Sequence, residues 1–271
     1  MRKLILAGLL VLGLLCPVLA QEEITLVVKR VSGKIPLDLN GSVWKGIKPT
    51  LVELQMQDQA APFGGGSIKD VIVRAIHNGK EIAFLMEWKD KTRDETMEGM
   101  ASFRDGVALQ FPLKTDDPGT PLMGGDGLVN IWYWRADWQA ILDGRYKEVQ
   151  PVLDYYPEKS LPGGTGLIPA VLAENPIARG PKGSPVEDLN ARSYGTLTSQ
   201  DRQDVSGKGA WKKGTWRVLF LRPLKTKDPM DAQFVPGKQT FINFAAWNGG
   251  DKDKNGHKSV TFLWHFLKLE K

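Results

Sequence analysis

The sequence predicts an all-β protein: a single β-sandwich domain with short helices and one long excursion rich in proline and glycine. Two observations support this fold class. Short runs of β-branched and aromatic residues recur along the chain, each bounded by Gly, Pro, Asp or Asn, and such runs are typical of sandwiches and barrels. Helical stretches are few and short, which favours the same class.

The predicted strands follow one another along the chain. The first is the alternating run ITLVVKRV at residues 24–31. The segment DVIVRAIHNGKEIAFLMEW at 70–88 contains two runs joined at Asn78-Gly79, a dipeptide that favours a tight hairpin. Five further runs are GVALQFPL (106–113), LVNIWYW (128–134), TWRVLFLRPL (215–224), QTFINFAAW (239–247) and SVTFLWHFLKLE (259–270).

Helices and loops fill the rest. The best helical stretches are DWQAILDG at 137–144 and PAVLAEN at 169–175. Residues 151–209 contain seven prolines and eight glycines and offer no convincing strand. A stretch of this length without secondary structure is uncommon in a compact domain. We interpret it as an ordered excursion that covers one end of the sandwich or serves as a docking surface.

We expect residues 1–20 to be a signal peptide. Two basic residues precede an apolar run at 4–15, and Val18-Leu19-Ala20 offers a small-residue cleavage site. Cleavage would leave one domain at 21–271, exported to the periplasm, with a net charge of +3 in place of +5. The apolar run is too short to span a bilayer, and no later segment approaches the required length. We therefore expect no transmembrane segment in the mature chain.

The only cysteine, Cys16, lies in this leader. The mature chain therefore has no disulfide of its own, no Cys-ligated zinc, no iron–sulfur cluster and no covalent c-type haem, which needs a CxxCH attachment. The basic and acidic residues are mixed along the chain, and an exported protein meets little nucleic acid. We expect no nucleic-acid partner.

No catalytic residue set is evident. The GxSxG, HExxH and P-loop motifs are absent. Gly64-Gly65-Gly66 is interpreted as an ordinary loop, and the histidines His77, His257 and His265 lie far apart in the sequence.

One segment resembles part of a calcium site. DKDKNG, which begins at Asp251 and contains Asp253, matches the start of an EF-hand loop. The twelfth position, which needs a bidentate Glu, is Phe262. We interpret the segment as a polar hairpin turn, and calcium at Asp251 and Asp253 is the alternative.

Four segments together resemble a known family. They are LMGGDGLVNIWYWRADW (122–138), DLNARSYGTLT (188–198), WKKGTWRVLFLRPL (211–224) and FAAWNGGDKDKNGHKSVTFLWHFLKLE (244–270), and IPLDLNGSVWKG (35–46) fits less specifically. In this order they are similar to the haem-binding γ subunit associated with ethylbenzene dehydrogenase. Similar subunits accompany dimethylsulfide dehydrogenase, selenate and chlorate reductases, and nitrite oxidoreductase, which belong to the DMSO reductase family.

The resemblance implies a β-sandwich that holds one haem b non-covalently between a Met and a Lys. The matching positions here are Met123 and Lys258. A thioether is a soft ligand that raises the reduction potential of haem iron. A lysine binds iron only as the neutral amine, so its pKa must be lowered by burial and by the metal. We expect four tryptophans to keep this pocket dry: Trp132, Trp134, Trp247 and Trp264.

His257 is the rival to Lys258 as iron ligand, because imidazole is a commoner haem ligand. Neighbouring residues of a strand face opposite sides, so only one of the two can point inward. His265 shares the side of His257 under regular alternation and is a weaker rival.

The function implied by the resemblance is electron transfer without a reaction of its own. The expected partners are a molybdenum-containing α subunit, an iron–sulfur β subunit and a soluble carrier such as cytochrome c. A solitary haem-binding protein is one alternative. The other is a haem-free carbohydrate- or ligand-binding module, because sandwiches with exposed tryptophans often bind sugars and this chain has nine tryptophans.

Overall fold

The structure is a computed structural model that describes residues 21–96, 102–121, 127–145 and 180–271. These residues form strands and few helices, which confirms the predicted all-β class. The helical elements named below are α1 (Ala136–Leu142) and the 3-10 turns η1 (Ser42–Trp44) and η5 (Gly249–Asp251). The strands are β1 (Thr25–Arg30), β2 (Thr50–Glu53), β3 (Gln55–Met56), β4 (Asp70–His77), β5 (Glu81–Lys89), β6 (Gly106–Pro112), β7 (Val129–Arg135), β8 (Val186–Ala191), β9 (Thr198–Ser199), β10 (Ser206–Trp211), β11 (Thr215–Pro223), β12 (Gln239–Trp247), β13 (Ser259–Val260) and β14 (His265–Leu269).

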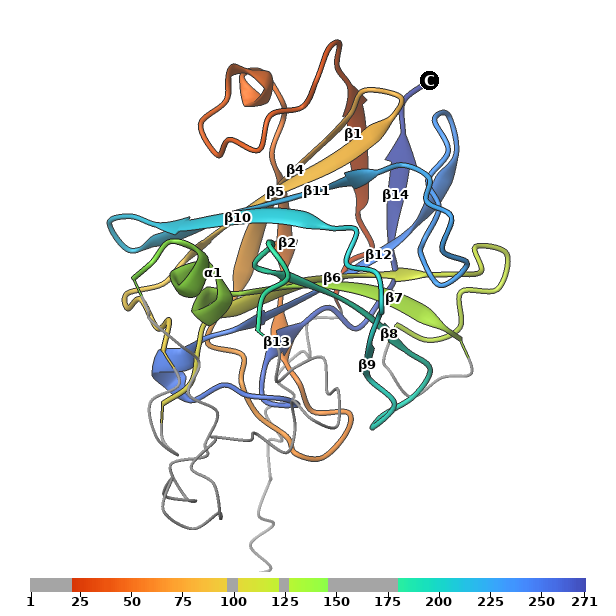
Figure 1. Cartoon of the computed structure of the whole chain (residues 1–271). Helices are drawn as coiled ribbons and strands as arrows, with labels where there is room; N and C mark the ends of the chain where they lie inside the picture. Colours follow the sequence, from red (N-terminus) through yellow and green to blue (C-terminus); the bar gives the residue numbers. More distant parts are fainter. Residues whose placement is uncertain (1–20, 97–101, 122–126, 146–179) are drawn as a thin grey trace, which may run out of the picture.

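The strands form two packed layers that are joined through β12 (Figure 1). The first sheet has the order β10-β11-β5-β4-β1-β14, with β2 on β4. The second sheet has the order β12-β6-β7-β8-β9, with β13 and β3 beyond β12. The first half of β12 pairs with β14, and its second half pairs with β6. One strand therefore belongs to both layers.

The main core lies between the two layers and is rich in aromatic rings. Trp134 and Trp216 approach with ring centroids 5.0 Å apart, and Phe111 and Trp132 with centroids 4.8 Å apart. Gly209 of β10 makes room for this packing, because a Cβ there would lie 2.2 Å from a ring carbon of Trp134. The core thus depends on inward-facing aromatics of β7 and on an inward-facing glycine of the opposite sheet.

The prediction that residues 151–209 form an excursion without strands is wrong for the part that the structure describes. Residues 180–209 contain β8, β9 and most of β10, and the remainder, with the helix expected at 169–175, lies outside the described residues. The sequence of β8, VEDLNA, is polar and yet fully buried. Each of its polar side chains has at least one partner: for example, Asn130 donates to Asp188 over 2.6 Å, and Arg135 pairs with Glu187 over 3.3 Å. A buried strand whose polar side chains are paired looks like a loop in sequence.

The last predicted strand also differs. Residues 259–270 divide into β13 and β14, with a break at 261–264. The helix expected at 137–144 is present as α1. The expected signal peptide at 1–20 lies outside the described residues, and in the described part of the chain no helix is long and apolar enough to cross a bilayer.

Candidate functional site

The second sheet has two apolar faces, and the candidate site lies on the one that faces away from the first sheet. We call this the outer aromatic face. Its buried members are Ala108, Val129, Ile131, Leu189, Ala191 and Trp264, and Tyr133, Phe241, Ala245 and Trp247 pack against them half-buried. Trp132 and Trp134 belong to the main core instead. The structure therefore brings Trp247 and Trp264 to one face and places Trp132 and Trp134 on the other.

Lys258 immediately precedes β13, and hydrogen bonds fix its backbone. Its N–H donates to the carbonyl of Gly64 over 3.1 Å, and its carbonyl accepts from the N–H of Gln57 over 3.1 Å. Its Nζ lies 5.2 Å from the ring centroid of Trp247. Lys258 is therefore held beside an aromatic ring of the outer aromatic face.

The Lys258 amine is in an unusual environment for a lysine. The residue as a whole is half-buried, but the protein atoms packed around the amine lower its pKa to about 8 by burial. No carboxylate or carbonyl of the described residues accepts a hydrogen bond from Nζ. Burial without a counter-charge favours the neutral form of an amine, and a neutral amine has a free lone pair.

The glycine run at 64–66 supports this lysine. Gly65 has a φ of +89°, and a Cβ there would lie 2.3 Å from the backbone nitrogen of Lys258. A Cβ on Gly64 would lie 3.2 Å from the ring of His257. The sequence alone predicts only an ordinary loop at these glycines. Three consecutive glycines were the available signal, since such runs permit close backbone approach.

The two rival histidines have other surroundings. His257 is half-buried, with its ring against Gly64. His265 is buried at the start of β14, where its Nδ1 accepts from the N–H of Ile24 over 3.2 Å and its ring lies 6.1 Å from that of Phe244 in the core. Burial lowers the pKa of His265 to about 4. The regular alternation expected between the two histidines is wrong, because the chain leaves the strand at 261–264.

The loop that leads to Lys258 is anchored by hydrogen bonds of three carboxylates, of which those of Asp253 and Asp105 are buried. In the DKDKNG segment, Asp253 accepts from the N–H of Asn248 over 3.0 Å, and Asp251 accepts from the Asn248 amide over 3.0 Å. Both carboxylates thus cap the turn that contains η5. The N–H of Gly249 donates to Asp105 over 2.9 Å, which ties the start of the loop to the core.

Asp105 is part of an acidic group in the described residues. Its carboxylate oxygens and those of Asp90 and Asp94 lie within 4.8 Å of one another. Burial raises the pKa of Asp105 to about 8, and the charge of Asp90 contributes. Burial also raises the pKa of Asp90. Asp251 and Asp253 are not members of this group.

Met123 lies outside the described residues, as do its neighbours at 122–126. The chain just before this gap is attached to the second sheet. Trp264 donates from its indole N–H to the carbonyl of Gly119 over 2.9 Å, and Gln110 donates to the carbonyl of Pro121 over 2.6 Å. The segment that contains Met123 therefore starts from a point fixed to the outer aromatic face.

Comparisons with known proteins place this architecture in a family. A candidate carbohydrate-binding protein from Bacteroides uniformis has a similar fold, with a TM-score of 0.51 at 12% identity over 92% of this chain and all of that one. The chain is 27% identical to the γ subunit of dimethylsulfide dehydrogenase from Rhodovulum sulfidophilum, over 92% of this chain and 82% of the relative.

Two other relatives have similar coverage. The γ subunit of chlorate reductase from Ideonella dechloratans is 24% identical over 89% of this chain and 83% of its own length. A proposed heme subunit of a respiratory nitrate reductase from Haloferax mediterranei is 23% identical over 85% and 68%. The profile named Ethylbenzene dehydrogenase matches residues 41–149 and 180–259, more than half of the chain. The chain belongs to the ethylbenzene dehydrogenase family.

Proposed function

We propose that this chain is the haem b subunit of a periplasmic molybdoenzyme complex and passes electrons between the iron–sulfur clusters of a partner and a soluble carrier such as cytochrome c. Family membership supports a subunit role, because two relatives are γ subunits of oxidoreductases and a third is named as a heme subunit. The observation that carries the proposal is the position of the Lys258 amine 5.2 Å from the Trp247 ring on the outer aromatic face, with no acceptor in the described residues; its pKa, lowered by the surrounding protein, is consistent with this role.

The described half of the site fits a haem. A haem needs a flat apolar wall and a donor to iron. The outer aromatic face supplies Trp247 beside the Lys258 amine, with Tyr133 packed against Trp247 and Trp264 elsewhere on the same face. Burial reduces the cost of deprotonating Lys258 to form an iron bond. In this proposal Met123 would be the second residue that holds the iron. When bound, a haem b supplies one-electron chemistry at iron, and the chain's own part is to ligate, orient and exclude water.

The proposed location and partners rest on the leader and on the resemblance. The leader at 1–20 has the composition of a signal peptide. A molybdenum-containing α subunit and an iron–sulfur β subunit would supply the chemistry for which residues 21–271 have no cysteine and no recognised catalytic motif. The direction of electron flow then depends on the substrate of that α subunit.

Reconstitution tests the cofactor directly. Purified full-length protein is titrated with hemin, and its absorption spectrum is recorded in the oxidised and reduced states. We expect one haem per chain, a six-coordinate low-spin spectrum, and complete release of the haem into acidified organic solvent, because the sequence has no CxxCH motif to hold it covalently. Protein that stays colourless after hemin addition while remaining folded by circular dichroism would contradict the proposal.

The carbohydrate alternative loses its main support in the structure. Sugar stacking needs exposed indole faces, but none of the nine tryptophans is exposed: seven are buried, and Trp211 and Trp247 are half-buried. The likeness to the Bacteroides protein, at 12% identity, concerns the fold alone.

A further inference from the structure

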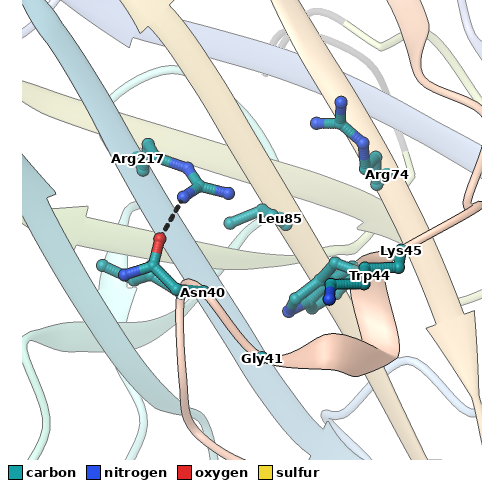
Figure 2. A pocket seen from close by; sticks show the side chains of 8 residues that line it. Asn40, Gly41, Trp44, Lys45, Arg74, Leu85 and Arg217 are labelled. Atoms are coloured by element: carbon teal, nitrogen blue, oxygen red, sulfur yellow. Dashed lines mark hydrogen bonds between the residues drawn. The ribbon is translucent and has the colours of Figure 1, made fainter.

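A second site lies on the outer surface of the first sheet, away from Lys258. There, residues 31–47 with η1 cross β4, β5 and β11 and form a small apolar cluster with them. Its members include Leu39 and Trp44 from the crossing segment and Leu85 and Leu219 from the sheet. At the edge of this cluster is a pocket of about 230 Å³. The residues that shape it are Asn40, Trp44, Lys45, Arg74, Leu85 and Arg217 (Figure 2).

The strand register places two arginines on either side of β5. Arg74 of β4 pairs with Leu85, and Arg217 of β11 pairs with Glu87, two residues further along the same face. In Figure 2 the two guanidinium groups flank Leu85, and Trp44 faces Leu85 from the crossing segment. The pocket thus has an apolar floor and wall between two planar cations.

Positive charge exceeds negative charge around this pocket. Glu87 serves both arginines: its Oε1 is 2.8 Å from Nε of Arg217, and its Oε2 accepts from Nη1 of Arg74. Lys45 adds a third positive group to the lining. The carboxylate of Asp38, which accepts from the N–H of Asn40 over 2.9 Å, borders the pocket as well. Three cations against the two carboxylates of Glu87 and Asp38 leave an excess of one positive charge.

The two arginines also keep donors free. Nη1 of Arg217 donates a hydrogen bond to the side-chain oxygen of Asn40 over 2.6 Å. Nη2 of Arg74 and Nη2 of Arg217 have no acceptor among the residues that the structure describes. The side chains are 24% and 31% exposed, so these donors are accessible from solvent. Guanidinium groups with free donors are suited to bidentate binding of carboxylate or phosphate.

We propose that this pocket binds a small organic anion, with its carboxylate or phosphate group between Arg74 and Arg217 and its apolar part against Trp44 and Leu85. The volume is below the roughly 300–1,000 Å³ of pockets for drug-sized ligands, so the ligand is small. The site is on the first sheet and does not involve the haem ligands, so its test is independent of the proposed electron-transfer role.

Two probes distinguish the anionic groups. Sodium benzoate offers a carboxylate on a flat ring, and sodium phosphate offers the phosphate group alone. Each is titrated into the full-length protein by isothermal calorimetry at low ionic strength, with sodium chloride as the reference. We expect saturable binding of at least one probe and weaker binding as salt is added, because exposed charges are screened. No saturable binding of either probe would overturn the proposal.

Substitutions then locate the site. Arg217→Gln and Arg74→Gln should each weaken binding by about tenfold or more, because each removes a charge-assisted contact. Arg217→Lys keeps the charge and loses the planar donors, so it should bind with intermediate affinity and also serves if the Gln variant fails to fold. Arg192→Gln, at an exposed position outside the pocket, is the matched control and should bind as the wild type does. Equal affinities in all of these variants would overturn the assignment.

Glu87→Gln separates anion binding from a purely structural role of the arginines. The carboxylate of Glu87 competes with an incoming anion for both guanidinium groups. Its neutralisation should therefore tighten binding by a few-fold, on the order of one screened charge interaction. If the arginines serve only to pair Glu87 across the strands, this variant will show no gain in affinity, and that result would count against the proposal.

Discussion

The inner and outer faces of the second sheet are both aromatic, but they differ in how their polar atoms are satisfied. On the inner face the indole N–H of Trp132 donates to the side-chain oxygen of Asn130 over 3.1 Å, and both side chains are fully buried. On the outer face the amine of Lys258 is packed against Trp247 without an acceptor in the described residues. The Trp132 indole is therefore satisfied without a ligand. A face with an unpaired amine is suited to receive one.

The largest effect is expected from removal of the unpaired Lys258 amine. In hemin-reconstituted protein, Lys258→Ala should open one axial position, so the low-spin absorption spectrum should change to a high-spin one. His257→Ala is the control and should leave the spectrum nearly unchanged, because that ring packs against Gly64. If the two variants behave in the opposite way, His257 is the ligand and the Met123/Lys258 pairing is wrong.

Tryptophan substitutions compare the two faces directly. Trp134→Ala, on the inner face, should lower the free energy of unfolding by about 3–5 kcal/mol, the range for large core truncations. Trp247→Ala, which is half-buried on the outer face, should cost roughly 1 kcal/mol in haem-free protein but should weaken hemin binding. Urea unfolding and hemin titration measure the two effects. Comparable losses of stability in both variants would show that the outer face is an ordinary core.

Two glycines with positive φ test whether the glycine run at 64–66 positions Lys258. Gly65→Ala adds backbone strain and a clash with Lys258, whereas Gly79→Ala adds strain alone, because nothing lies within 4 Å of its Cβ position. We expect Gly79→Ala to cost about 1 kcal/mol and Gly65→Ala roughly 2–3 kcal/mol. Gly65→Ala should also disturb the haem spectrum, which Gly79→Ala should not. Equal costs and unchanged spectra would mean that Gly65 does not position Lys258.

The smallest expected effect concerns the acidic group that anchors the loop of Lys258. The pKa of Asp105 is raised to about 8 in the folded protein, so its contribution to stability is present below about pH 4 and is lost as the pH rises through 8. Asp90→Asn replaces a buried negative charge beside Asp105 by an amide. The free energy of unfolding of the Asp90→Asn variant should therefore fall less between pH 4 and pH 8 than that of the wild type. The difference should be roughly 1–2 kcal/mol. Asp201→Asn, at an exposed site, should follow the wild-type pH profile.

Sequence reasoning identified strands wherever apolar residues alternate or run together. It missed β8 because Glu187, Asp188 and Asn190 are polar, and only the folded structure shows that Arg135 and Asn130 pair with such groups. It grouped four tryptophans into one pocket because they flank the two ligand positions. Alternation puts Trp132 and Trp134 on the same side of β7, but it does not say that this side is the interior.

Only part of the candidate site can be predicted from the sequence, because its residues come from segments that are far apart in the chain. Lys258 came from the resemblance, and Met123 stays a prediction because it lies outside the described residues. The contact of Gly65 with Lys258 joins positions nearly two hundred residues apart in the chain. No local pattern encodes a contact of that separation, although the glycine run itself was visible.

The strand β12, which both sheets share, affects how the protein unfolds locally. Because its two halves are hydrogen-bonded into different sheets, neither layer can unzip on that side without breaking the ladder of the other. Amide protons along β12 should therefore exchange with solvent only through global unfolding, and they should be among the slowest in the protein. The turn that ends at Lys258 continues directly from this strand. In the proposed role of Lys258 as an iron ligand, its loop is attached to a strand that both sheets hold, so it would need little reorganisation when the charge of the bound group changes, and low reorganisation favours fast electron exchange.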